Sequence, residues 1–201
     1  MTGDRIVMQA SDEKDTIRAK MKKARDKLSF NDYRVSCMSI MEICKSLPVW
    51  RESRTVHCYV ASKNNEVDTL GLIIDMLDMG KQVVVPRCVP GSRDLINIRI
   101  RSLDMLKTSA YGLMEPEYDP ANVISPERFD LIIVPLLAFD RQGGRVGFGG
   151  GYYDTLLVKA NCPTVGMAYS FQEVDRVPVE DHDVKLNNIV TEREVIRIDY
   201  G

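Results

Sequence analysis

The sequence has little net charge. Its 201 residues include 27 basic and 29 acidic side chains, which leaves a formal charge of −2. A protein that binds nucleic acid or an anionic membrane through its whole surface carries a clear excess of lysine and arginine. Binding of that kind is excluded, so any polyanion must be recognised by a local group of residues.

Long apolar runs and targeting patterns are also missing. No stretch approaches the roughly 20 apolar residues that a membrane helix requires. The first fifteen residues contain four acidic side chains and no apolar run after a basic flank, which is not the pattern of a secretory or transit peptide. We expect a soluble, cytoplasmic monomer without a membrane or nucleic-acid partner.

The five cysteines contain no CxxC pair and are odd in number, which excludes a disulfide framework and a cysteine zinc site. We interpret them as buried or idle thiols in a reducing compartment. A chain of this length can bury a core without such cross-links. We expect a flexible N-terminal tail over residues 1–13 and a single α/β domain over residues 14–201.

Helix and strand patterns alternate along most of the chain. Helices are predicted over residues 15–28, 32–47, 67–79 and 152–160. Strands are predicted over residues 55–61, 82–85, 95–100, 131–138, 164–168 and 189–196. This order predicts an α/β fold in which a mostly parallel sheet is sandwiched between helical layers, with an N-terminal helical pair.

Residues 143–154 connect an apolar strand pattern to a helix pattern, which is where ligands of open α/β sheets bind. Six glycines in this segment allow backbone N–H groups to approach an anion and allow positive φ angles. They are Gly143, Gly144, Gly147, Gly149, Gly150 and Gly151. The helix that begins near Tyr152 adds free amides and its dipole. The segment therefore predicts a phosphate-binding loop.

Two charged residues in this loop favour a nucleotide. Arg145 supplies forked donors for phosphoryl oxygens, and Asp154 supplies a hard oxygen ligand for the magnesium that accompanies ATP. The loop is not a P-loop, because no Lys-Ser/Thr pair follows the glycines, and its spacing misses GxGxxG. A purely structural turn is the alternative, but six glycines with an arginine and a terminal acid exceed what a tight turn needs.

The stretch PLLAFDRQGGRVGFGGGYYD resembles the signature of the 5-formyltetrahydrofolate cyclo-ligase family, also called methenyltetrahydrofolate synthetases. The similarity runs from Lys14 to about Thr191 and is strongest in the glycine loop. The resemblance implies ATP-dependent conversion of 5-formyltetrahydrofolate, with or without a polyglutamate tail, to 5,10-methenyltetrahydrofolate. The family reaction proceeds by phosphorylation of the formyl oxygen and attack by N10, and releases ADP and phosphate.

The resemblance also assigns residues to each ligand. ATP would be bound by Lys14, Arg18, Gly144, Arg145, Val146, Gly147, Phe148, Gly149, Gly150, Gly151, Tyr152 and Tyr153. Folate would be bound by Lys63, Glu66, Asp68, Glu115, Pro116, Phe148, Tyr152 and Tyr153. Asp154 and Asn187 would hold Mg²⁺, and Arg145 would be the catalytic residue that stabilises phosphoryl charge.

Plain structural alternatives exist for several of these residues. Lys14 and Arg18 share one helix face, which a solvated basic surface would also explain. That is our interpretation of the other basic residues of this helix, Lys20, Lys22, Lys23, Arg25 and Lys27. Asn65 followed by Asp68 has the spacing of a helix cap, although the family pattern favours Asp68 as a folate contact.

Three positions depart from the family pattern. Phe148 and Gly150 stand where family loops often carry basic residues, which leaves Arg145 as the main cation of the loop. Asn187 stands where a family acid assists magnesium. A neutral oxygen neutralises less charge, so either the magnesium affinity is lower or Asp183 compensates.

Two other functions stay open at this stage. One is a sugar-phosphate isomerase or deaminase that uses Glu66 or Asp68 as a base. The other is a nucleotide- or RNA-binding module that uses the basic first helix, although that helix lacks the interleaved aromatic residues that single strands stack on. We interpret His57 as a satisfied core histidine and His182 as a surface histidine.

Overall fold

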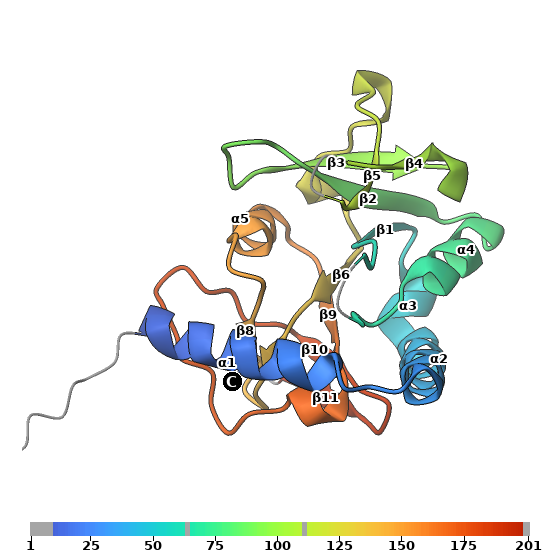
Figure 1. Cartoon of the computed structure of the whole chain (residues 1–201). Coiled ribbons are helices and arrows are strands. Elements are labelled where there is room, and N and C mark those ends of the chain that lie inside the picture. Colours follow the sequence, from blue (N-terminus) through green and yellow to red (C-terminus); the bar gives the residue numbers. More distant parts are fainter. Residues whose placement is uncertain (1–9, 63–64, 110–111, 199–201) are drawn as a thin grey trace, which may run out of the picture.

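The computed structural model describes residues 10–62, 65–109 and 112–198 (Figure 1). Its centre is a seven-stranded sheet in the order β11-β10-β9-β6-β1-β2-β3. The strands are β1 Thr55–Cys58, β2 Gln82–Cys88, β3 Leu95–Ile100, β6 Leu131–Pro135, β9 Thr164–Met167, β10 Asn188–Val190 and β11 Val195–Arg197. Only the two edge strands, β3 and β11, pair antiparallel, so the predicted mostly parallel sheet is confirmed.

Helices cover both faces of the sheet, as predicted. Alternate side chains of a strand point to opposite faces. In β2, Val83 and Val85 therefore pack into one apolar core while Val84 packs into the other. The first core is closed by α2 Phe30–Ser46, α3 Pro48–Glu52 and α4 Leu70–Asp78, and the second by α5 Tyr152–Lys159. No helix of the described residues is long and apolar enough to cross a membrane.

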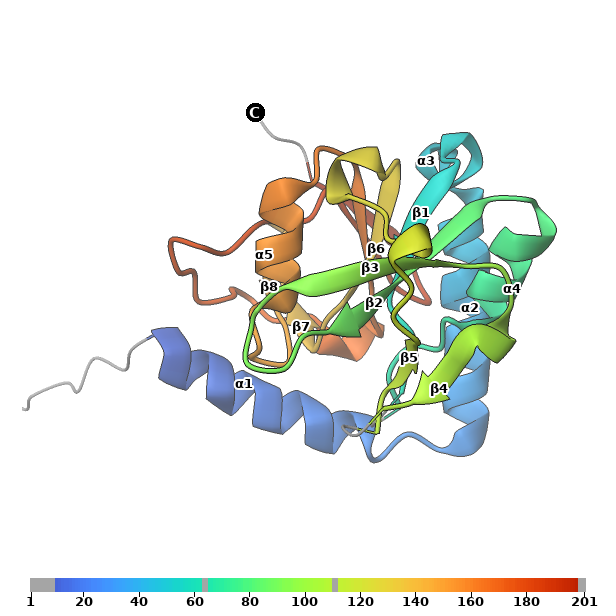
Figure 2. The ribbon, with the colours of Figure 1, turned by 90° about the horizontal axis from the view of Figure 1, so that it is seen from above.

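Helix α1 Ala10–Arg25 lies apart from these layers, along the edge of the molecule (Figure 2). It packs Ile17 and Met21 against a small hairpin formed by β7 Ala138–Phe139 and β8 Arg145–Val146. The helix begins at Ala10, so residues 10–13 of the predicted tail are helical. Its first turn carries Asp12 and Glu13, whose charges favour a helix N-terminus. Residues 1–9 lie outside the described part.

The C-terminal region differs from the prediction. We expected one strand over residues 189–196, but the chain folds into the β10–β11 hairpin. Thr191 makes this turn, because its hydroxyl oxygen accepts from the N–H groups of Arg193 and Glu194. In the sequence, the apolar residues on the two sides of this short polar turn have the pattern of one continuous strand. A second small hairpin, β4 Leu106–Thr108 with β5 Met114–Pro116, was also not predicted.

Candidate active site

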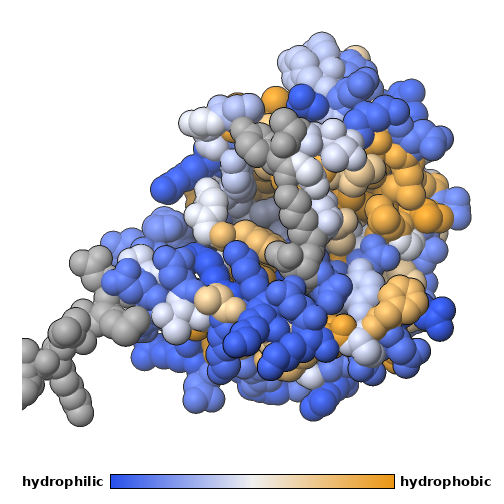
Figure 3. Space-filling view, in the orientation of Figure 1, coloured by the Kyte–Doolittle hydropathy of each residue, from blue (hydrophilic) through white to orange (hydrophobic). Residues whose placement is uncertain are grey.

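A cavity of about 690 Å³ opens beyond the carboxyl ends of β1, β2 and β6. This volume suits a small-molecule ligand. The connections from β1 and from β6 run in opposite directions across the sheet, and ligands of open α/β sheets bind at such a point. The space-filling view shows the hydrophilic surface of α1 below a hollow in the molecule (Figure 3).

The first half of the glycine segment is a structural turn. Asp140 is buried, and its Oδ1 accepts from the N–H groups of Gln142 and Gly144, both at 2.9 Å. Its Oδ2 accepts from the N–H of Val177 at 2.8 Å. At Gly143, where φ is 85°, a Cβ atom would lie 2.7 Å from a backbone oxygen, so a side chain is excluded. The Phe-Asp pair of the signature therefore shapes the loop.

The second half of the segment lines the cavity with backbone. Gly149 and Gly151 have positive φ angles of 104° and 69°. A Cβ atom on Gly150 would lie 2.7 Å from the ring of Tyr152. Gly151 is the N-cap of α5 and makes no side-chain cap, so no side chain of the N-cap residue covers the helix N-terminus, where an anion is favoured. Residues 147–151 all line the cavity, as a phosphate-binding loop should.

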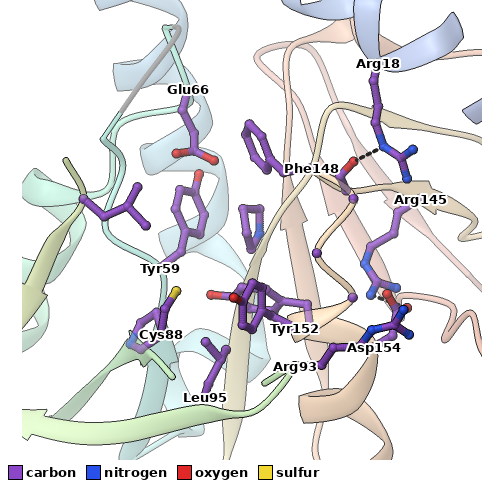
Figure 4. Close-up of a pocket in the computed structure, with 18 of the residues that line it drawn as sticks. Arg18, Tyr59, Glu66, Cys88, Arg93, Leu95, Arg145, Phe148, Tyr152 and Asp154 are labelled. Atoms are coloured by element: carbon purple, nitrogen blue, oxygen red, sulfur yellow. Dashed lines mark hydrogen bonds and ion pairs between the residues drawn. The ribbon is translucent and has the colours of Figure 1, made fainter. Parts of the chain in front are cut away.

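Three cations approach this loop, and each is held by an oxygen. Lys14 is 3% exposed, and its Nζ lies 2.6 Å from both Glu180 Oε2 and Asp183 Oδ2. Arg18 donates through Nε to the carbonyl of Gly147 at 2.9 Å (Figure 4). Arg145 is also held by oxygens, through Nη2 to Asp154 Oδ1 at 2.6 Å and through Nη1 to the carbonyl of Val184. The cations are thus held in place at the loop.

Carboxylates gather beside these cations. Asp154, Glu180 and Asp183 all line the cavity. Ligand atoms of Glu180, His182 and Asp183 lie within 4.8 Å of one another. The main-chain N–H of Glu180 donates to Asp183 Oδ2 at 2.8 Å, which orients that carboxylate. Hard oxygen donors of this kind suit a divalent cation such as Mg²⁺.

The opposite wall is more apolar and carries two acids, of which Glu115 is buried and Glu66 is half-buried. Glu115 is 7% exposed, and its Oε1 accepts from the N–H of Cys88 at 2.9 Å. Burial raises the pKa of Glu66 to about 7, against the pull of the Arg25 guanidinium. Tyr59 lies beside Glu66 and donates its hydroxyl to the carbonyl of Val67 (Figure 4). This wall suits a flat, polar-edged ring.

The structure brings most of the predicted site residues to one cavity. The predicted residues that line it are Lys14, Arg18, Glu66, Glu115, Arg145, Gly147, Phe148, Gly149, Gly150, Gly151, Tyr152, Tyr153 and Asp154. Those that do not line it are Asp68, Pro116, Gly144, Val146 and Asn187. Lys63 lies outside the described residues.

The exceptions have local causes. Asp68 Oδ1 accepts from the N–H of Leu70 at 3.0 Å, in a local turn at the start of α4. The N-cap of α4 is Thr69, and Asn65 donates to the carbonyl of Arg25, so the cap expected from Asn65 and Asp68 does not form. Asn187 Oδ1 accepts from both the N–H and the hydroxyl of Thr164, at 2.8 and 2.9 Å. The expected place of Asn187 in the metal site is therefore not supported. Asp183, the acid expected to compensate for Asn187, lines the cavity.

Sequence reasoning missed several residues of the cavity wall. Arg93, from the β2–β3 loop, packs over Gly151. Lys22 also lines the cavity, and Arg25 is 1% exposed, although we had placed both on a solvated face. His182 is exposed but stands at the rim beside two acids. The sequence signal for the contacts of Lys22 and Arg25 is their spacing from Arg18, four and seven residues, which places them on the same face of α1.

A glycine-rich loop leading into a helix, with lysine and arginine around it at the carboxyl ends of parallel strands, defines an α/β enzyme for a phosphate-bearing substrate. A sequence model of the 5-formyltetrahydrofolate cyclo-ligase family matches residues 10–192. The chain belongs to this family, as the glycine segment indicated.

Known relatives agree with this assignment. The 5-formyltetrahydrofolate cyclo-ligase of Haemophilus influenzae is 31% identical over 179 residues, which cover 87% of this chain and 95% of the relative. A probable 5-formyltetrahydrofolate cyclo-ligase of Schizosaccharomyces pombe is 31% identical and covers 92% and 98%. The NMR structure of Aquifex aeolicus 5,10-methenyltetrahydrofolate synthetase has a TM-score of 0.82, with 34% identity and 94% of both chains covered.

Proposed function

We propose that this protein converts 5-formyltetrahydrofolate to 5,10-methenyltetrahydrofolate with consumption of ATP. The observation that carries the proposal is that one cavity is lined both by the glycine loop with its cations and by the Glu66 wall. The two substrates would meet between these walls. Membership of the cyclo-ligase family supports the same reaction.

The reaction requires activation of a poor leaving group. The formyl oxygen attacks the γ-phosphorus, so that an O–P bond forms while the bond from phosphorus to the ADP oxygen breaks. N10 then attacks the formyl carbon of the resulting iminium phosphate and loses its proton. The C–O bond breaks, phosphate departs, and the methenyl bridge remains. The protein's part is positioning and charge stabilisation, because no side-chain nucleophile is needed.

The ATP phosphates would bind the loop wall. Backbone amides of residues 147–151 and the start of α5 offer donors, and Lys14, Arg18 and Arg145 offer positive charge. Arg145 is the candidate catalytic residue, because its buried guanidinium lies beside the loop where phosphoryl charge would be redistributed. Arg93 is a further cation of this wall that lies outside the family motif.

Folate would bind the opposite wall. A pterin ring carries adjacent N–H donors, which match the two oxygens of a carboxylate. Glu66 is the best placed acid for this pairing, and Tyr59 and Tyr152 line the same cavity for ring contacts. The Glu115 carboxylate accepts a hydrogen bond from the main-chain N–H of Cys88, so Glu115 would shape the wall.

Magnesium would be held by Asp154 and by the Glu180 and Asp183 carboxylates, whose oxygens suit it. When bound, it would neutralise charge on the polyphosphate. The five free thiols, three of them buried, support a location in a reducing compartment such as the cytoplasm.

The test is a direct assay with purified protein, 5-formyltetrahydrofolate and Mg-ATP. The absorbance of methenyltetrahydrofolate should rise, with one phosphate released for each product molecule. A β,γ-imido analogue of ATP should give no product, because its terminal bond resists transfer. Equal product without nucleotide, or no product with ATP, would contradict the proposal.

A further inference from the structure

Arg25 is an arginine inside the molecule. It is the last residue of α1 and is only 1% exposed, although its neighbours Asp26 and Lys27 are exposed. Burial of a charged side chain is costly unless its surroundings compensate it. A buried arginine in contact with Phe148, a residue that lines the cavity, calls for a specific explanation.

The first contact of Arg25 is with the glycine loop. The guanidinium carbon lies 5.7 Å from the centre of the Phe148 ring, a distance at which a cation and an aromatic face attract each other. Phe148 itself lines the cavity and is 43% exposed. Its side chain extends from the loop towards the wall that holds Glu66 and Tyr59 (Figure 4). Lys22 Nζ lies 6.0 Å from the same ring centre, so Arg25 and Lys22 hold the ring together.

The second contact is with the turn before Glu66. Asn65 has a φ of 47°, a left-handed conformation that asparagine tolerates. Its Nδ2 donates to the carbonyl of Arg25 at 2.8 Å, and its own carbonyl accepts from Tyr169 Oη at 3.0 Å. This contact with the main chain of Arg25 anchors the residue next to Glu66 to the end of α1, and it does not depend on the Arg25 side chain.

The charge of Arg25 also reaches Glu66. Burial raises the pKa of Glu66 to about 7, and the Arg25 guanidinium opposes this rise. The other titratable groups around this carboxyl are Cys58 at the end of β1, Tyr59 directly after it, and Tyr153 from α5. Among the described groups whose charge acts on the Glu66 carboxyl, Arg25 is the one with a positive charge.

We propose that Arg25 is a positioning residue for the folate: its guanidinium, together with Lys22, holds the Phe148 ring, and its main-chain carbonyl anchors the turn before Glu66, so that Phe148 and Glu66 face the same bound pterin. The inference rests on the proposed cyclo-ligase function. Arg25 would contact neither the formyl group nor the γ-phosphate. It acts through Phe148 and Glu66, which line the cavity.

The experiment compares Arg25→Met, which removes the charge, with Arg25→Lys, which keeps it without the planar fork. The KM for each substrate is measured, and the KM for 5-formyltetrahydrofolate is followed from pH 5.5 to 9. In Arg25→Met we expect the folate KM to rise by about tenfold, since a charge-assisted contact is weakened. The ATP KM should stay near that of the wild type. The pH below which folate binding weakens should move up by about one unit, because Glu66 loses its nearby cation.

Arg25→Lys should show an intermediate folate KM with a pH midpoint close to that of the wild type. Lys23→Met is the matched control, because Lys23 is an exposed cation on the same helix, and it should match the wild type. An unmoved pH midpoint in Arg25→Met, or equal rises of both KM values, would overturn the inference. If Arg25→Met does not fold, a wild-type folate KM in Arg25→Lys would overturn it. A wild type without turnover would contradict the proposed function instead.

Discussion

Arg145 and Asp154 form an ion pair in the wall of the cavity, with Nη2 of the arginine 2.6 Å from Oδ1 of the aspartate. The arginine side chain is 4% exposed, and its Nη1 donates to the carbonyl of Val184. One guanidinium thus holds the proposed magnesium ligand and the chain segment next to Asp183. Removing one partner of such a pair leaves an uncompensated charge.

We expect Arg145→Ala to lower kcat by about 10²-fold or more, the usual cost of losing one preorganised electrostatic donor. The KM for ATP should change less, because the loop amides still bind the phosphates. The assay is steady-state formation of methenyltetrahydrofolate, with circular dichroism as a check of folding. Arg141→Ala is the control, since Arg141 is in the same turn but makes exposed ion pairs with Glu173 and Glu194. Near-normal kcat in folded Arg145→Ala would mean that Arg145 is structural.

A different result is expected for Lys14→Met. Lys14 neutralises Glu180 and Asp183, so its loss leaves two carboxylates facing the polyphosphate. The KM for ATP should rise by about tenfold, the effect of one charge-assisted contact, while kcat changes less. Lys20→Met, an exposed cation of the same helix, should behave like the wild type. An unchanged ATP KM would show that Lys14 serves only the ion pairs.

The glycine loop could be predicted from the sequence, because the residues that determine its structure are local. The glycines, the arginine and the helix start are close neighbours in the chain, and the positive φ angles at Gly149 and Gly151 follow from residue type. The parallel sheet was predictable for the same reason, since its strands and helices alternate in order.

Contacts between distant segments could not be predicted in this way. Arg25 contacts Phe148 through its guanidinium and Asn65 through its main-chain carbonyl, and both partners come from other parts of the chain. Helix periodicity places Arg25 on a face but does not say what covers that face. Likewise, the order of motifs places Asn187 near the metal, whereas its side chain is bound to Thr164 of β9.

The position of Asn187 leads to a magnesium titration. Asp154→Asn and Asp183→Asn should raise the magnesium concentration needed for half-maximal activity, because each removes an anionic oxygen from the cavity. Asn187→Asp should leave that concentration unchanged, since its Oδ1 still accepts from Thr164. Activity is measured at fixed ATP and folate. A lower magnesium requirement in Asn187→Asp would place this residue at the metal after all.

His57 lies in β1, wholly buried beneath the site, between the rings of Phe129 and Tyr153. We interpreted it as a satisfied core histidine, but neither ring nitrogen has a hydrogen-bond partner among the described residues. Burial lowers the pKa of His57 to about 3, with a weaker opposing effect of Asn97. Asn97 Oδ1 also lacks a partner of acceptable geometry in the described part.

This burial makes the free energy of unfolding depend on pH. A histidine in the unfolded chain titrates near pH 6.5. Between that pH and about 3 the unfolded chain binds a proton that the folded protein excludes, so stability falls as the pH falls, by at most about 1.4 kcal/mol per pH unit. Glu66 acts in the opposite sense from pH 7 to about 4.5, because its raised pKa makes the folded protein bind the extra proton.

We therefore expect His57→Leu to remove the destabilising part of this dependence. At pH 7 the variant should be as stable as the wild type or slightly more stable, because the buried ring nitrogens have no described partner to lose. From pH 7 to pH 4 its advantage should grow. Urea unfolding at each pH measures this difference, and Glu66→Gln, which should lose the opposite contribution, is the control. Parallel pH profiles for the wild type and His57→Leu would show that His57 has partners, such as buried water, that keep its pKa near the ordinary value.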